Sequence, residues 1–277
     1  MSADMAPTCL TNFLFRYSSG DGFGGALYCE DANVLLASCF FRSNTAYYAG
    51  GAVSGKGAFL ILRNCVFEDN GNEEVWGSTC FFEEASSIEM FDCAVTGAQG
   101  EKGVTFHESD FLVQNGLFSN NFCCALNGEG STGQIRDSRF FDNQSAYYSG
   151  GAYFWGSDVS LSGCVFFRNS GDDGGALYCR NETALEAQNC LFSENASDDG
   201  AVCFNGGTAS LQNCTLFSNQ CAGVYGINLA KMTLRNTILW SNLSGSYNVE
   251  TGLDITSSCL PEEFGANNIQ VDPMMDS

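Results

Sequence analysis

Hydrophobic and polar positions follow a nine-residue motif, L-x-x-C-x-F-x-x-N, that recurs every 22 to 28 residues along this chain. The Cys and Phe positions alternate with variable residues, which predicts a short strand with one buried face. A fixed period of this length is typical of one supersecondary unit that is stacked on itself. Full or close copies lie at Leu36–Asn44, Leu62–Asn70, Leu161–Asn169 and Leu211–Asn219, and looser copies at Met90–Ala98, Val113–Asn121, Ile135–Asn143, Ala187–Asn195 and Leu234–Asn242.

A second motif, Gly-Gly-Ala, follows the loop after the Asn and begins another short β-type run. It stands at residues 24–26, 50–52, 150–152 and 174–176, and a shortened copy is Gly200-Ala201. We expect the two glycines to form a corner that needs positive φ or a close approach of two backbones, and the alanine to point inward. Each repeat therefore holds about three short strands and three corners.

Turns of this kind cannot bury their apolar faces alone, and stacking them buries a continuous core. The sequence thus predicts an all-β fold, a right-handed parallel β-helix of about ten to eleven coils. We expect one domain over residues 1–277, with coils at about 9–245 and a closing segment at 246–277. Leucine-rich repeats share the motif spacing, but there a convex half follows the strand, whereas here a Gly-Gly-Ala strand follows. Because the repeat begins almost at the first residue, we expect a fragment of a longer protein.

Two columns of like residues follow from the stacking. The Asn column should be a structural ladder in which side-chain amides bond to the neighbouring coils. The Cys column should consist of free, buried thiols, because side chains on in-register parallel strands point the same way, which gives a disulfide a poor torsion. The members are Asn44, Asn70, Asn121, Asn143, Asn169, Asn195, Asn219 and Asn242, and Cys39, Cys65, Cys93, Cys164, Cys190 and Cys214.

The repeated Gly-Gly-Ala runs, together with F-x-x-N at Phe41/Asn44, Phe67/Asn70 and Phe166/Asn169, resemble the paired motifs of the chlamydial polymorphic outer membrane proteins. The segment Asn268-Ile269-Gln270-Val271-Asp272-Pro273 is similar to the N-I-x-x-D-P segment that often closes such domains. The resemblance covers nearly the whole chain, and it implies a β-helix module at a cell surface. The family's secretion signal and its C-terminal barrel are not seen in this sequence.

Charge narrows the choice of partners. The formal net charge is −21, with only 11 Lys and Arg residues, which argues against nucleic acid and against anionic membranes. No apolar stretch reaches 18 residues, so direct insertion into a membrane is not expected. The 15 Cys residues follow the repeat and not C-x-x-C pairs, so a zinc site is not expected. We expect an extracellular or cell-surface location and a protein or carbohydrate partner.

Acidic residues occupy the same loop of two successive coils, at Asp172, Asp173, Asp198 and Asp199. Four clustered carboxylates need water and screening or a bound cation. A solvated loop is the favoured interpretation, no cofactor is expected, and a weak calcium site is the alternative.

Candidate acid–base chemistry is sparse. His107 and Glu108 lie in the least regular coil, with Lys102 nearby. If the protein is an enzyme, we expect Asp173, Asp199, His107 and Glu108 to carry the reaction. The paired tyrosines Tyr47-Tyr48 and Tyr147-Tyr148 are expected to pack down over their coils, and stacking on a sugar is the alternative.

Two functions remain open from the sequence. The favoured one is a non-catalytic surface module of the adhesin type, because the repeat is nearly uniform and no coil is rich in acid–base residues. The alternative is a carbohydrate-active enzyme, a polysaccharide lyase or glycoside hydrolase, that uses one face of the β-helix.

Overall fold

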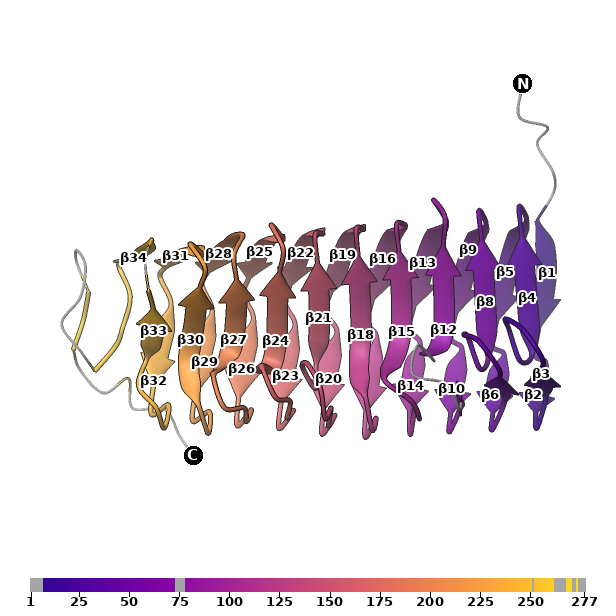
Figure 1. Ribbon diagram of the computed structural model, residues 1–277, viewed down its shortest axis with the longest axis horizontal. Coiled ribbons are helices and arrows are strands. Elements are labelled where there is room, and N and C mark those ends of the chain that lie inside the picture. Colours follow the sequence, from indigo (N-terminus) through magenta and orange to yellow (C-terminus); the bar gives the residue numbers. More distant parts are fainter. Residues whose placement is uncertain (1–6, 73–77, 251, 262–267, 271–272, 274–277) are drawn as a thin grey trace, which may run out of the picture.

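The computed structural model describes all residues except 1–6, 73–77, 251, 262–267, 271–272 and 274–277. The described residues form a parallel β-helix, in which each coil lays one strand on each of three long sheets (Figure 1). Every strand pair of these sheets is parallel, and the register between β24 and β27 shifts only between Gly174 and Leu177, so the predicted all-β solenoid is confirmed. The described part of the chain has no helix that is long and apolar enough to cross a membrane.

The three sheets differ in the part of the repeat that they carry, and a small fourth sheet lies beside the N-terminal coils. The rear sheet holds β1 (Thr8–Thr11), β5 (Asn33–Ala37), β9 (Phe59–Arg63), β13 (Ser87–Phe91), β16 (Asp110–Gln114), β19 (Thr132–Arg136), β22 (Asp158–Ser162), β25 (Ala184–Gln188), β28 (Thr208–Gln212), β31 (Lys231–Arg235) and β34 (Leu253–Thr256). The lower sheet holds β2 (Leu14–Arg16), β6 (Phe40–Arg42), β10 (Val66–Glu68), β14 (Ala94–Thr96), β17 (Leu117–Ser119), β20 (Arg139–Phe141), β23 (Val165–Phe167), β26 (Leu191–Ser193), β29 (Thr215–Phe217) and β32 (Ile238–Trp240). The front sheet holds β4 (Leu27–Glu30), β8 (Val53–Lys56), β12 (Ser78–Glu83), β15 (Lys102–His107), β18 (Cys124–Glu129), β21 (Ala152–Trp155), β24 (Gly174–Arg180), β27 (Gly200–Asn205), β30 (Ala222–Ile227) and β33 (Tyr247–Val249). The small sheet holds β3 (Ser19–Gly20), β7 (Thr45–Ala46) and β11 (Gly71–Asn72).

The L-x-x-C-x-F-x-x-N motif spans the corner between the rear and lower sheets. Its Leu lies one residue before the end of a rear strand, and its Phe lies at the centre of a lower strand. The second variable residue after the Leu turns the chain with positive φ, as at Asn64 (φ 51°) and Asp137 (φ 50°). Asn and Asp tolerate this left-handed conformation better than most residues, which explains their frequency at the corner.

Phenylalanine rings fill the interior behind the lower sheet. Phe140 and Phe166 stack with ring centroids 4.4 Å apart and an interplanar angle of 3°, and Phe192 continues the stack at 5.2 Å. All three side chains are fully buried, as are Phe41 and Phe67 of the N-terminal coils. The inward direction predicted for the motif Phe is therefore confirmed.

The asparagine ladder is present as predicted. The Nδ2 group of Asn143 donates to Oδ1 of Asn169 at 2.8 Å and to the carbonyl oxygen of Phe118 at 3.0 Å. The same pair of bonds recurs along the column, so each buried amide joins the corners of neighbouring coils. The ladder is interrupted at Ala98, whose backbone N–H donates directly to Oδ1 of Asn121.

The thiols of the Cys column are buried and donate to backbone carbonyl oxygens of the preceding coil, as from Cys65 to Leu36 at 3.5 Å. Each cysteine of the column has a free thiol in the structure. Its protection and pairing state in solution stay a prediction.

The Gly-Gly-Ala corner has a different physical basis in different coils. Gly24 and Gly50 have positive φ, as expected, whereas Gly175 does not. A Cβ atom added to Gly175 would lie 2.7 Å from the backbone nitrogen of Ala196, so close approach of the next coil explains this glycine. Ala176 is fully buried, which confirms its inward direction.

The closing segment continues the solenoid. Strands β33 and β34 pair in parallel with β30 and β31, which extends the coils to Thr256. Asn268 then bonds to the corner at Ser258 in the manner of a ladder asparagine. Val271 and Asp272 of the similarity segment lie outside the described residues.

Candidate functional site

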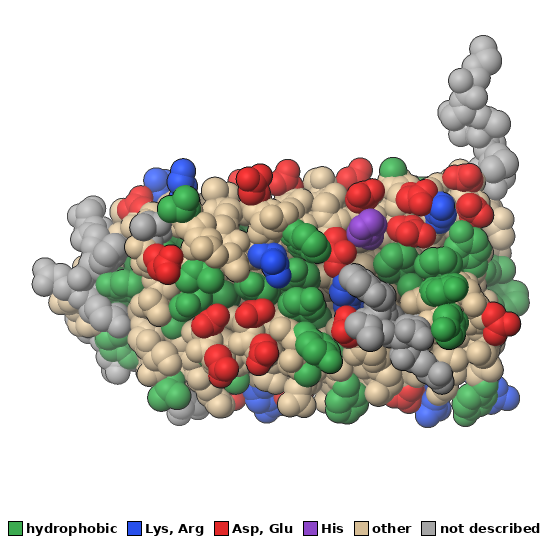
Figure 2. All heavy atoms as spheres, in the orientation of Figure 1, with side chains coloured by type: hydrophobic (Ala, Val, Ile, Leu, Met, Phe, Trp, Pro, Cys, Tyr) green, Lys and Arg blue, Asp and Glu red, His purple; other side chains and the backbone are tan. Residues whose placement is uncertain are grey.

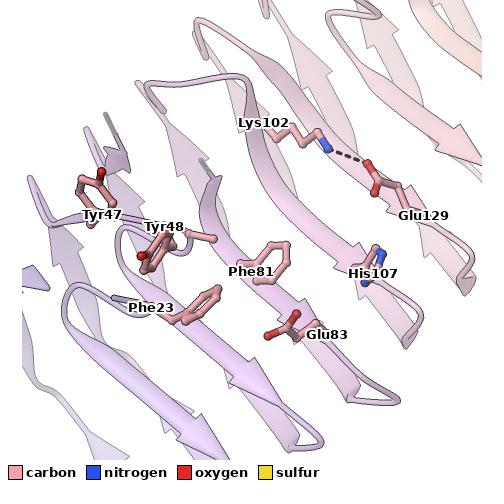
Figure 3. Close-up of a pocket in the computed structure, with 9 residues that line it drawn as sticks. Phe23, Tyr47, Tyr48, Phe81, Glu83, Lys102, His107 and Glu129 are labelled. Atoms are coloured by element: carbon pink, nitrogen blue, oxygen red, sulfur yellow. Dashed lines mark hydrogen bonds and ion pairs between the residues drawn. The ribbon is translucent and has the colours of Figure 1, made fainter. Parts of the chain in front are cut away.

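A pocket of about 480 Å³ lies on the outer face of the front sheet, over the N-terminal half of the β-helix. One side of this pocket is aromatic (Figure 3). The Phe23 ring lies 5.7 Å from Tyr48 and 6.2 Å from Phe81, measured between centroids. Tyr47 meets Tyr48 edge to face at 4.9 Å. We call Phe23, Tyr47, Tyr48 and Phe81 the aromatic wall.

The paired tyrosines behave differently in the two halves of the molecule. Tyr47 and Tyr48 are 52% and 54% exposed, so the expectation that they pack down over their coil is wrong. Tyr148 does pack, and its ring lies 4.6 Å from that of Tyr153. Tyr147 is 59% exposed, so the first pair differs from the second in that both of its rings are exposed.

The other side of the pocket carries ionisable groups from three successive coils. Strands β12, β15 and β18 end at Glu83, His107 and Glu129, and the register aligns these residues in one outward row. Neighbouring strands are about 4.8 Å apart, so the two glutamates are separated by roughly 9–10 Å at the backbone. Figure 3 shows His107 and Glu83 beside the aromatic wall, and Figure 2 shows the chain's single histidine, in purple, among acidic side chains with hydrophobic groups on either side.

Glu129 is held by a buried ion pair. The ammonium group of Lys102 donates to Oε1 of Glu129 at 2.6 Å, and the two side chains are 7% and 17% exposed. The amide of Asn127 donates to the same oxygen at 3.0 Å. Burial by itself raises the pKa of Glu129, but attraction to Lys102 and these hydrogen bonds outweigh burial, so the pKa is lowered.

The pKa of Glu83 is shifted in the opposite direction, upward. Its partial burial raises the pKa of the carboxyl, and the neighbouring Glu84 carboxylate raises it further. The imidazole of His107 interacts electrostatically with both glutamates. Two carboxyl groups whose pKa values are moved apart in one pocket are typical of an acid–base pair.

Unsatisfied polar atoms mark the same three strands. Four buried side-chain atoms lack a hydrogen-bond partner among the described residues: Ser78 Oγ, Thr105 Oγ1, His107 Nδ1 and Asn127 Oδ1. All four belong to β12, β15 or β18. Of these residues only His107 lines the pocket, so its Nδ1 is the buried polar atom there that a water or a ligand could satisfy.

The structure separates the residues that the sequence grouped as candidates. His107 lines the pocket, whereas Glu108 follows it at a corner with φ of 47° and lines only smaller hollows outside it. Asp173 and Asp199 lie farther along the helix, and neither lines these hollows. The catalytic role of these four residues is untested.

The acidic loop keeps its carboxylates close together. Burial raises the pKa of Asp173, and the charges of Asp199 and Asp172 raise it further. Burial likewise raises the pKa of Asp199, with help from Asp198. Among the described residues, no group of three or more His, Cys, Asp or Glu side chains is arranged to hold a metal ion. Calcium binding at this loop therefore stays a prediction without a described coordination site.

Sequence reasoning missed Phe23, Phe81, Glu83 and Glu129. The two glutamates could have been found from the last residue of each front strand, because Glu83, His107 and Glu129 occupy equivalent positions there. Aligning the ends of these strands would have shown three ionisable groups in a row. Phe23 could not be found this way, because it lies in a loop.

Comparisons with known proteins agree with this architecture. The family model for the right handed beta helix region matches residues 10–151 and 103–259. No curated protein matches this chain. Among solved structures, a variant of the periplasmic alginate epimerase AlgG is 11% identical over 95% of this chain and 77% of its own, with a TM-score of 0.56. The A-module of the mannuronan C-5 epimerase AlgE4 from Azotobacter vinelandii is 12% identical over 92% of this chain and 79% of its own, with a TM-score of 0.49.

At this identity, the likeness to AlgG concerns the fold alone. The family match, in contrast, spans nearly all the described coils and agrees with their parallel register. The chain belongs to the right-handed β-helix family.

Proposed function

We propose that this chain is a carbohydrate-active enzyme that hydrolyses an uncharged polysaccharide at the pocket on the front sheet. The observation that carries the proposal is the outward row Glu83–His107–Glu129 beside the aromatic wall. Aromatic rings bind the apolar faces of sugar rings, and paired carboxyl groups cleave glycosidic bonds.

The acid step falls to Glu83. Its raised pKa keeps the carboxyl protonated over a wider pH range, so it can donate a proton to the glycosidic oxygen as the bond to the anomeric carbon breaks. The leaving sugar then departs as an alcohol.

The base step falls to Glu129. Its carboxylate, kept ionised by Lys102, accepts a proton from a water molecule whose oxygen bonds to the anomeric carbon. The roughly 9–10 Å between the backbones of the two glutamates leaves room for that water, as in inverting glycosidases. His107, between the two, supplies a polar contact to the sugar hydroxyls.

Charge favours an uncharged substrate. The chain carries a net charge of −21, and two carboxyl groups line the pocket, so a polyuronate would be repelled. AlgG is named as an alginate epimerase, which supports action on a polysaccharide by analogy of fold only. AlgG is also named as a periplasmic protein, which is in keeping with a location outside the cytoplasm.

A polysaccharide panel tests the proposal. Xylan, β-glucan, α-glucan and chitin would be assayed for reducing ends, and pectin and alginate also for unsaturated products. We expect reducing ends from at least one uncharged polymer, loss of this activity in Glu83→Gln and Glu129→Gln, and full activity in Glu186→Gln. Glu186 is the matched control, because it is exposed on β25 of the rear sheet.

Other outcomes would contradict hydrolysis. Unsaturated products from a polyuronate would indicate a lyase. Binding without any product would favour the second candidate, a non-catalytic surface module, for which the exposed rings of Tyr47 and Tyr48 are the supporting observation. The narrower resemblance to the chlamydial surface proteins stays a prediction that rests on the repeat motifs.

A further inference from the structure

The pocket continues toward the C-terminal end of the front sheet. A second hollow of about 290 Å³ lies beside it, and His107 and Glu129 line both. The far side of this second hollow is formed by Trp155 and Asn181. The proposed reactive groups therefore lie between two hollows, with the aromatic wall on one side and an indole on the other.

Trp155 is placed by the same register that aligns the glutamates. It is the next residue in the outward row after Glu129, and Arg180 follows it. The Arg180 guanidinium lies 5.6 Å from the centroid of the indole ring, and such a contact holds an aromatic ring in a fixed orientation. The ring nevertheless remains 44% exposed.

We propose that Trp155 forms a second sugar subsite, so that the substrate is a polymer lying along the β-helix axis and cleaved at an internal bond. This inference rests on the proposed function. An exposed indole next to Glu129 offers a flat apolar surface to the sugar beyond the bond that is cleaved, while the aromatic wall holds the sugar before it. The surface from Phe81 on β12 to Trp155 on β21 crosses four adjacent front strands, which is too long for a single sugar.

Several observations favour a neutral chain in this second hollow. Glu129 and Glu108 line it, and its described lining residues include no Lys or Arg that would attract an anionic sugar. The Asn181 side chain offers both a donor and an acceptor, which suits sugar hydroxyls.

The test measures how affinity depends on chain length. Xylan, cellulose and chitin oligosaccharides, from disaccharides to longer oligomers, would be titrated by calorimetry into Glu83→Gln protein, in which cleavage is blocked. Affinity should rise with length until a chain spans both hollows. Adding Trp155→Ala should remove that gain, a loss of roughly three- to tenfold for long chains, and leave the shortest ligand unaffected.

Two further variants separate a subsite from a structural role. Trp155→Phe should restore most of the length dependence, because a flat ring remains. Trp240→Ala, at a half-buried indole on β32 of the lower sheet, should change nothing in binding. Binding that ignores Trp155→Ala, or an equal loss for short and long ligands, would overturn the subsite alone. Failure of Glu83→Gln protein to bind any of these oligosaccharides would overturn both the subsite and the proposed function.

Discussion

At the scale of single residues, the Lys102–Glu129 pair shows how the stacking of coils brings together two groups that alter a pKa in the site. Lys102 begins β15 and Glu129 ends β18, so the ion pair crosses from one coil to the next. A buried pair of this kind is weak evidence for stability, because desolvation opposes the attraction. Its consequence for the site is the lowered pKa of Glu129, which keeps a base ionised beside Glu83, whose raised pKa favours the protonated form.

Replacing Lys102 tests whether its charge lowers the pKa of Glu129. Lys102→Met leaves a largely buried carboxylate without its counter-charge, so unfolding free energy at pH 7 should fall by roughly 3–5 kcal/mol. Glu129 has a folded-state pKa below its unfolded value, and the stability it contributes is present above the unfolded pKa and lost as pH falls through the folded one. In the variant, Lys102 no longer opposes the effect of burial, which should raise the pKa of Glu129, so the carboxyl becomes protonated and the deficit shrinks between pH 7 and about pH 4. Urea unfolding at both values measures it.

The control is Lys56→Met, because the Lys56 ammonium pairs with Glu84 at 2.9 Å on the exposed surface. It should change stability little at either pH. A deficit in Lys102→Met that is the same at pH 7 and pH 4 would contradict electrostatic pairing as the cause.

At the scale of elements, the columns inside the coils determine stability. Phe166 stacks between Phe140 and Phe192 and is fully buried, so neighbouring rings cannot close the space that its removal leaves. Phe166→Ala should lower the unfolding free energy by about 3–5 kcal/mol. Phe167→Ala, on the same strand but partly exposed, is the matched control and should cost much less. Equal denaturation midpoints for the two variants would argue against a stacked core.

The Gly-Gly-Ala corner gives a second element-scale prediction. A side chain at Gly175 would meet Ala196 and Asn195 of the next coil, whereas a Cβ atom at Gly22 would meet nothing within 4 Å. Gly175→Val should destabilise the protein by about 1–3 kcal/mol through overpacking. Gly22→Val should be close to neutral. Thermal melts of the two variants compare them directly, and similar melting temperatures would contradict the close-approach explanation.

The elements were predictable from the sequence because their causes are local and repeated. The Phe and Cys positions of the motif face inward, and Asn44 and its equivalents form the ladder, as their period requires. Which of the two expected reasons applies at Gly175, positive φ or close approach, was not predictable, since the contact that excludes a side chain comes from the next coil. The pocket was harder still. Only His107 of its ionisable row was singled out, because Glu83 and Glu129 become neighbours of His107 only when three coils are placed in register.

At the scale of the whole molecule, the solenoid offers one long face on which successive coils can place like or unlike groups in a row. Most of the outward row of the front sheet changes from coil to coil, from Lys56 through Glu83, His107 and Glu129 to Trp155. The buried columns, in contrast, hardly change. The fold is thus maintained by the inner residues, while the outer row is free to carry a site along the helix axis.

The most direct test of a glycan site on this face uses the chain's single histidine. Its imidazole Cε1–H signal in a proton NMR spectrum needs no assignment. The signal reports on the part of the pocket between Glu83 and Glu129. Xylan, cellulose and chitin oligosaccharides would be titrated into the wild-type protein and into Glu186→Gln as the control. We predict a saturable shift of the His107 signal with at least one uncharged oligosaccharide in both proteins, and loss of the shift when Tyr48 and Phe81 are replaced by alanine. A signal that no oligosaccharide moves, or a shift that survives removal of these aromatic rings, would contradict the account.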